Sequence, residues 1–276
     1  MRPRLSTLAA AAALAACGGG PPKPAGLAYS LPAVTAVTYM TGDSASMDID
    51  AGGQYFQMDL NRSSTLGTTF TRSADGIQVS VDVKDFSATQ SNPMGAPVHA
   101  DGSGIKGPLV FSLDRRGTPT VVSKPVVGGV ASSYFEPVEV ATALFPRLPG
   151  RAAHPGDTWT DTINYEATPG SSTAKSTSVV TYTVVGDTVA GGHSVIKVAI
   201  KATGERSSSG NFAGMDFSQK LTSTSEGWFL WDLQRGLMVE KYVTDDASGS
   251  MDVSAAPYPL ALRVRTENRI RLTEEM

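Results

Sequence analysis

The sequence predicts a mainly β protein, built of antiparallel sheets with one central helix near residues 135–146. Most segments outside that helix alternate apolar with polar residues, as strands with one wet face do. Paired glycines and Asp-Gly steps separate these segments, which is typical of an antiparallel meander, sandwich or part-barrel. No β-α-β alternation occurs, which disfavours a parallel sheet. We therefore expect either a curved half-barrel or two similar β halves.

Residues 1–17 have the parts of a bacterial export signal. Arg2 and Arg4 are basic, residues 5–16 form an apolar run too short for a membrane-spanning helix, and the run ends Leu14-Ala15-Ala16-Cys17. These last four residues resemble the lipobox of bacterial lipoproteins. The resemblance implies that Cys17 is diacylated on its sulfur, that residues 1–16 are then removed as a signal peptide, and that the new N-terminus is acylated, with fatty acyl chains such as palmitate. The alternative is an ordinary secretory signal.

Residues 17–26 are predicted to be the lipidated cysteine and a flexible tether rich in glycine and proline. Two or more acyl chains on one residue are enough for stable membrane anchoring. The nine residues after Cys17 span at most about 30 Å, which would hold the folded body close to the membrane. Cys17 is the only cysteine, so a disulfide within this chain is excluded.

The rest of the chain divides into an N-terminal β half (27–133), a helix with a proline-rich connector (134–157) and a C-terminal β half (158–276). In the first half, Ile77, Val79, Val81 and Val83 alternate with polar residues. Residues 87–105, rich in Ser, Asn, Pro and Gly, are expected to form a long loop. In the second half, the alternating segments are 158–168, 176–186, 194–204, 215–233, 236–244 and 258–272.

The central helix is predicted from apolar residues at helical spacing. Phe135, Val138, Ala141 and Leu144 lie on one stripe, and Pro137 suits the first turn. Prolines follow at positions 146 and 149, which forbid continuation. A helix of roughly ten residues is not stable alone in water, so we expect it to dock on the sheet.

Residues 107–117 and 227–236 resemble each other. Each reads as a strand, a turn closed by Arg-Gly, and a returning strand. This pattern fits an internal duplication, but it also fits any two β hairpins.

Composition and motifs exclude several functions. After residue 16 the chain has 21 basic and 26 acidic residues, a net charge of −5, and no basic patch, so we expect no nucleic-acid partner. No glycine-rich phosphate loop opens a helix. His99, His154 and His193 lack metal-ligand spacing, so we expect neither a metal nor another cofactor.

Residues 42–46, Gly-Asp-Ser-Ala-Ser, superficially resemble the nucleophile block of the Gly-Asp-Ser-Leu hydrolases. That family supplies its histidine base from an Asp-x-x-His motif, which is absent from this sequence. A turn between strands is the preferred interpretation.

Asp48 and Asp50 share one predicted strand face, with Asp59 nearby. A solvated strand face is the preferred interpretation of these residues, and a weak cation site is the alternative.

A wider resemblance rests on the lipobox, the segment 148–159 and the hairpin 229–237. Together they look like uncharacterised β-rich bacterial envelope lipoproteins, over roughly residues 105–245. The layout is also similar to that of lipoprotein carriers and lipid-binding lipoproteins, which fold as a curved half-barrel around an apolar cavity. No sequence motif carries this second likeness.

Large apolar residues are the candidate site. Trp228 with Leu230, and Phe229 with Trp231, occupy opposite faces of one strand, so both faces need cover. These residues form either the core or the wall of an apolar pocket. The candidates are Phe135, Leu144, Trp159, Trp228, Phe229 and Trp231.

The sequence thus predicts a lipoprotein of the bacterial envelope, anchored by Cys17 to the outer membrane or cell membrane and facing the periplasm or exterior. Without a base–nucleophile pair, we expect a non-enzymatic binder of a lipid or other apolar ligand, or of an envelope protein. The alternatives are a structural envelope component and, less favoured, an envelope hydrolase. A buried apolar cavity would favour the ligand binder, and a filled core would favour the structural or partner-binding roles.

Overall fold

The structure is a computed structural model that describes residues 26–74, 76–91, 95–168, 172–212 and 214–275. The predicted signal peptide, Cys17 and all but the last residue of the tether lie outside these residues. The N-terminal elements are β1 (Ala36–Asp50), β2 (Tyr55–Ser73), β3 (Gly76–Gln90), β4 (Val98–Asp101), η1 (Gly102–Gly104), β5 (Ile105–Lys106), β6 (Leu109–Leu113), β7 (Pro119–Ser123), β8 (Val126–Val127) and η2 (Gly129–Ser133). The others are α1 (Pro137–Ala143), β9 (Thr158–Ala167), β10 (Ser172–Ala190), β11 (His193–Phe212), β12 (Met215–Asp232), β13 (Leu237–Val253) and β14 (Leu260–Glu275).

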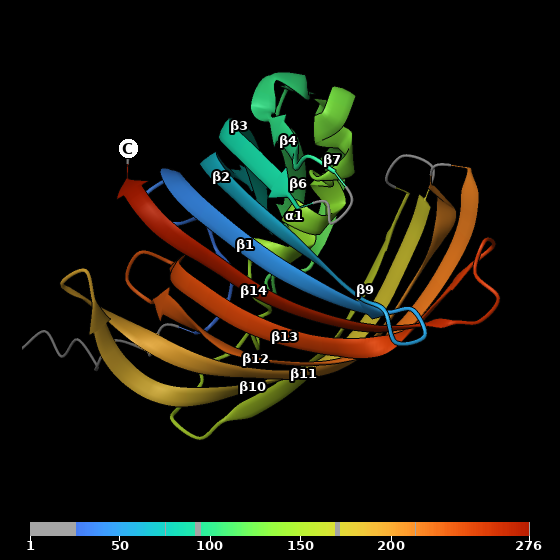
Figure 1. The fold of residues 1–276 in the computed structure, drawn as a ribbon. Coiled ribbons are helices and arrows are strands. Elements are labelled where there is room, and N and C mark those ends of the chain that lie inside the picture. Colours follow the sequence, from blue (N-terminus) through green and yellow to red (C-terminus); the bar gives the residue numbers. More distant parts are fainter. Residues whose placement is uncertain (1–25, 75, 92–94, 169–171, 213, 276) are drawn as a thin grey trace, which may run out of the picture.

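One antiparallel sheet of 12 strands dominates the fold, in the order β7-β6-β3-β2-β1-β14-β13-β12-β11-β10-β9, with β4 also paired to β3. The first and last long strands, β1 and β14, pair along most of their length and join the strands of the two sequence halves. The sheet is strongly curved but not closed (Figure 1). The predicted mainly β class with one short helix is therefore confirmed. Within the described residues, no helix is long and apolar enough to span a membrane.

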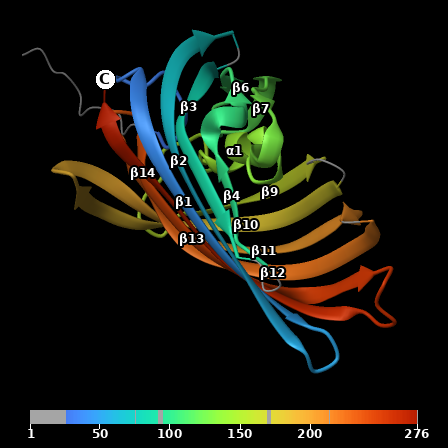
Figure 2. The ribbon, with the colours of Figure 1, turned by 45° about the horizontal axis from the view of Figure 1, so that its top comes forward.

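The helix α1 lies on the concave side of the sheet, between its two ends, and contacts β6, β7 and β9 (Figure 2). It is shorter than predicted, with seven residues. It begins after Glu136, whose carboxylate accepts a hydrogen bond from the Val138 amide, and Pro137 occupies the first turn as expected. Leu144 ends the helix, and the following irregular chain passes into the core.

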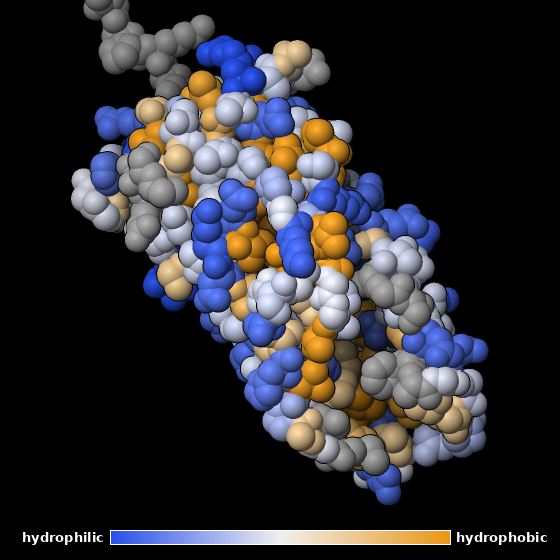
Figure 3. Space-filling view, turned by 90° about the horizontal axis from the view of Figure 1, so that it is seen from above, coloured by the Kyte–Doolittle hydropathy of each residue, from blue (hydrophilic) through white to orange (hydrophobic). Residues whose placement is uncertain are grey.

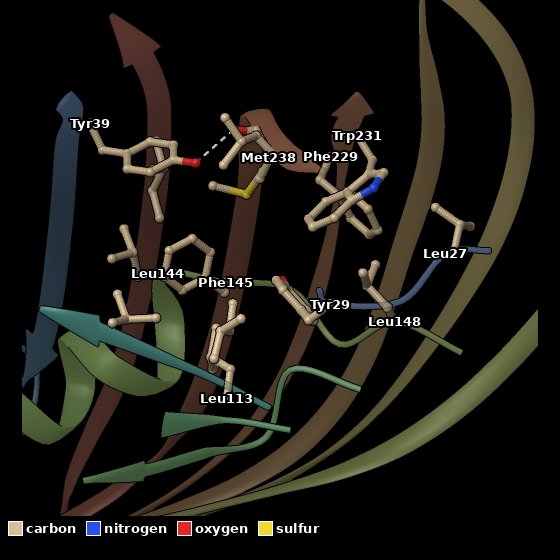
Figure 4. Close-up of a cluster of buried hydrophobic side chains, with 14 of the residues drawn as sticks. Leu27, Tyr29, Tyr39, Leu113, Leu144, Phe145, Leu148, Phe229, Trp231 and Met238 are labelled. Carbon is tan, nitrogen blue, oxygen red and sulfur yellow. Dashed lines mark hydrogen bonds between the residues drawn. The ribbon is translucent and has the colours of Figure 1, made fainter. Parts of the chain in front are cut away.

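The main core fills the space between the sheet and the chain segments packed on its concave side. Phe145 lies at its centre, with its ring edge-to-face with Tyr29, Tyr39 and Phe70. The Tyr39 hydroxyl donates a 3.0 Å hydrogen bond to the Met238 carbonyl, which ties β1 to β13 (Figure 4). This end of the concave side is therefore a packed interior.

A second, smaller core changes the prediction for residues 87–105. Strand β3 continues to Gln90, and β4 pairs with its last four residues. Phe86, Ala88 and Ala100 from these strands pack with Phe135, which precedes α1. The expected long loop is thus partly sheet, because its few apolar residues are buried against the helix segment.

The two similar segments both form the predicted hairpins. In each turn the side chain of an aspartate accepts hydrogen bonds from backbone amides that follow it in the chain. Asp114 accepts from the amides of Arg116 and Thr118, and Asp232 accepts from those of Gln234 and Arg235. Burial acts to raise the pKa of both carboxyls. The amide hydrogen bonds, together with the guanidinium of Arg235 beside Asp232 and that of Arg147 near Asp114, outweigh it and lower the pKa. Whether the hairpins descend from a duplication stays a prediction.

Candidate binding site on the concave face

Five of the six candidate residues pack in apolar clusters. Leu144, Trp159, Phe229 and Trp231 belong to the main core, and Phe135 belongs to the smaller one. Trp159 stacks on Tyr182, with ring centroids 5.2 Å apart, and donates its indole hydrogen bond to the Arg147 carbonyl. A small cleft of about 60 Å³ lies beside Phe135 and Leu144.

Trp228 lies on the opposite, convex face of β12. It is half-buried, and it contacts the Tyr242 ring on the neighbouring strand. The Lys197 ammonium lies 5.3 Å from the centre of its ring. We expected both faces of β12 to be covered. On the convex face, the side chains of neighbouring strands on that same face cover Trp228.

Beyond the packed core, polar residues occupy the concave face. Strand register places Arg62 of β2, Asp43 of β1 and Asn268 of β14 side by side. Because every second residue of a strand shares a face, Lys241 and Asp245 lie in the adjoining rows on β13. We name this set, with Arg206 of β11, the polar belt: Asp43, Arg62, Arg206, Lys241, Asp245 and Asn268.

The polar belt lines an open hollow of about 540 Å³. Its walls come from β1, β2 and β9–β14, with Glu139 and Ala143 of α1 at the inner end. Figure 3 shows the hollow at the lower right, with apolar surface inside it. A volume of this size is within the range of ligand pockets in proteins.

Arg62 connects the sheet to the helix at the inner end of the hollow. Its guanidinium lies 3.1 Å from Glu139 Oε1 and 3.7 Å from Asp43 Oδ2, and it donates a hydrogen bond to the Tyr134 carbonyl. Burial raises the pKa of Asp43, and Arg62 and the amide of Asn268 oppose that rise. These contacts hold the three charged side chains in place.

Lys241 lies at the boundary between the core and the hollow. Its Nζ donates a 2.6 Å hydrogen bond to the carbonyl oxygen of Ala143, the last residue of α1. Burial lowers the pKa of Lys241 to about 8, although Asp43 acts in the other direction. The amine therefore satisfies a helix C-terminal carbonyl that has no partner within the helix.

Asp245 is the most buried charged group of the belt, with a side chain only 5% exposed. Its Oδ1 accepts a 2.6 Å hydrogen bond from Ser225 and lies 3.0 Å from the Arg206 guanidinium. Its Oδ2 has no hydrogen-bond partner among the described residues, and neither has Arg62 Nε. A buried carboxylate oxygen without a hydrogen bond lowers the stability of the fold, so a hydrogen-bond donor from a bound molecule would be favourable at this position.

An apolar surface adjoins the belt on the side away from the core. Along β13 and β14, the next residues on the concave face after Asp245 and Thr266 are Ala247 and Val264. The surface, which we name the apolar ledge, consists of Leu221, Ala247, Leu262, Ile49, Met251 and Val264. The last three are only half-buried and leave apolar area accessible.

The convex face is polar by comparison. Asp48 pairs with Arg265 at 3.3 Å, and Arg263 and Arg265 both contact Asp246. The Asp48 carboxylate thus has an arginine partner on a solvated strand face, in line with the preferred interpretation of this residue. Within the described residues, no group of three or more His, Cys, Asp or Glu side chains could hold a metal ion.

The turn predicted at residues 42–46 is wrong, because all five residues lie within β1. Asp43 is held there by the Asn268 amide, which donates to its carboxylate from the neighbouring strand. Of the histidines, His99 contacts the Thr89 hydroxyl at 3.0 Å, and His193 lies 3.9 Å from Asp232. The structure brings Asp43, but neither of these histidines, into the hollow.

The fold and site define a β-rich protein with a large open antiparallel sheet, a filled main core and a polar hollow on the concave face. No model of a known protein family matches the chain, and no curated protein sequence matches it. The solved structures that align with it include a BenF-like porin from Pseudomonas fluorescens Pf-5 (8% identity, 86% of this chain and 99% of that one, TM-score 0.23). A mutant of a Rh. blastica porin aligns at 9% identity over 86% of this chain and 100% of that one, with a TM-score of 0.17. At these TM-scores the distant likeness to porins carries no argument about activity.

Proposed function

We propose that the protein is a lipid-anchored lipoprotein of the bacterial envelope that binds an amphiphile, a molecule with a polar head and an apolar tail, without chemical conversion. The envelope location and the anchor at Cys17 rest on the lipobox resemblance of residues 14–17. An anchor of this kind would place the hollow beside a membrane, where amphiphiles are abundant.

One observation supports the amphiphile most strongly. The polar belt and the apolar ledge are adjoining rows of one concave surface, and the belt contains the unpartnered Oδ2 of Asp245. A purely apolar ligand would leave that oxygen unpaired, and a purely polar ligand would leave the ledge uncovered. A ligand with both parts satisfies both requirements.

Five of the six candidate residues fill packed cores, which is the outcome expected for a structural or partner-binding role. The proposal therefore rests on the open hollow instead, and it moves the expected ligand position there. None of the six lines the hollow of about 540 Å³. They fill the core that supports it, or, for Trp228, lie on the convex face.

Native mass spectrometry of the Cys17→Ser protein, purified from the soluble fraction and incubated with a bacterial membrane extract, tests the proposal. We expect a bound amphiphile in the native protein and its loss in Ala45→Trp, because Ala45 lines the hollow and the larger side chain would occupy it. Thr224→Trp, on the convex face of β12, is the control and should retain the ligand. A protein that carries no amphiphile and takes up none when titrated would refute the proposal.

A further inference from the structure

We infer that the head of the ligand is a neutral, hydroxyl-rich group, such as a sugar, and that Asp245 Oδ2 accepts a hydrogen bond from one of its hydroxyls. This inference rests on the proposed function and specifies the chemical class of the head. It follows from the charge balance of the hollow, from the pairing of its charged groups and from its two unpartnered polar atoms.

The charges that line the hollow cancel. Among the described lining residues, four are acidic and four are basic. A strongly charged head would be favoured by an excess of lining residues of the opposite charge, and the described lining has no such excess. Eleven further lining residues carry hydroxyl or amide groups, including Ser178, Gln219 and Asn268. Such groups both donate and accept hydrogen bonds, as the hydroxyls of a sugar do.

Most of the charged groups already have partners. Arg62 pairs with Asp43 and Glu139, Arg206 pairs with Asp245, and Lys241 donates to the end of α1. An anionic head would have to compete with the acidic partners of Arg62 and Arg206. A neutral head can add hydrogen bonds without breaking an ion pair.

Two side-chain atoms of these charged residues have no hydrogen-bond partner in the part of the chain that the structure describes, and they are of opposite kinds. Asp245 Oδ2 is an acceptor, and Arg62 Nε is a donor. Both residues line the hollow. A cationic head would suit only the first atom and an anionic head only the second. A group with several hydroxyls can satisfy both, since each hydroxyl has one donor and two acceptor sites.

The test compares amphiphiles that share one tail and differ in the head. Calorimetric titrations of the Cys17→Ser protein use dodecyl maltoside, dodecyltrimethylammonium and dodecylphosphocholine, each below its micelle concentration, and free maltose. We expect dodecyl maltoside to bind at least tenfold more tightly than the cationic dodecyltrimethylammonium and the zwitterionic dodecylphosphocholine. Free maltose should bind much more weakly than dodecyl maltoside, because it lacks the part that covers the apolar ledge.

Asp245→Asn should weaken the binding of dodecyl maltoside by about tenfold and leave dodecylphosphocholine unchanged. Asp246→Asn is the matched control, because Asp246 is the next residue of β13 and faces the convex side, where it pairs with Arg263 and Arg265. The comparison of heads on the parent protein needs no variant, so it decides the question even if Asp245→Asn fails to fold.

Equal affinity for all three heads would overturn this inference and leave the amphiphile proposal standing. Tightest binding of the trimethylammonium compound would also overturn it, since Asp245 would then be the counter-ion of a cation. Maltose binding as tight as that of dodecyl maltoside would keep the hydroxyl-rich head and refute the amphiphile. Failure of every compound to bind would refute both.

Discussion

The side chain of Lys241, on β13, donates a hydrogen bond of 2.6 Å to the carbonyl oxygen of Ala143 at the end of α1. The two residues are 98 positions apart in sequence. The contact fixes the end of the only α-helix of the described residues against the sheet, at the point where the packed core gives way to the polar hollow.

This contact predicts a pH dependence of stability. Burial lowers the pKa of Lys241 to about 8, whereas a lysine in an unfolded chain titrates near 10.4. Between these values the unfolded chain binds a proton that the folded protein does not, so the free energy of unfolding should rise as the pH increases from about 8 to 10. Urea unfolding at pH 7, 8, 9 and 10 would measure this rise, and it should be absent from Lys241→Met. An identical pH profile in the variant would contradict the prediction.

Docking of the helix segment predicts a large effect of one core substitution. Leu144 is only 1% exposed and belongs to the main core. Leu144→Ala should lower the free energy of unfolding by about 2–5 kcal/mol, because it removes buried apolar contacts and leaves a cavity. Val130→Ala, at a side chain that is 51% exposed, should change it by less than about 0.5 kcal/mol. Similar effects of the two changes in urea unfolding would show that Leu144 does not anchor the segment.

The anchor predicted from the lipobox resemblance can be tested separately. Cys17→Ser should move the protein from the membrane fraction to the soluble fraction, because the acyl chains would have no attachment site. Intact-mass analysis of the native protein should show a lipidated Cys17 as the first residue. An unmodified cysteine, or cleavage at another position, would exclude the lipoprotein assignment.

The sequence predicts local structure well because alternation and turn residues act locally. The pattern of Ile77, Val79 and Val81 matches three buried positions on β3, and the turns at Asp114 and Asp232 form as expected. The central helix is in the predicted place but ends earlier, since Phe135 and Phe145 are buried in separate clusters outside it.

The hollow could not be predicted in the same way. Alternation shows which residues share a face, but not which strands become neighbours. The pairing of Asp43 with Asn268 joins residues 225 positions apart, and no local pattern specifies it. Polar residues on a curved sheet are expected on the convex, wet side, so Lys241 and Asp245 resemble ordinary solvent-facing positions until the register of β13 is known.

Binding in the hollow is most directly measured with a fluorescent label that responds to the polarity of its surroundings. Cys17 is the only cysteine, so the Cys17→Ser protein accepts a single label at Gln219→Cys in the hollow, or at Thr224→Cys on the convex face of the same strand. Titration with dodecyl maltoside should shift the emission of the first label to shorter wavelength, with saturation, and leave the second unchanged. No shift at position 219, or equal shifts at both positions, would contradict amphiphile binding on the concave face.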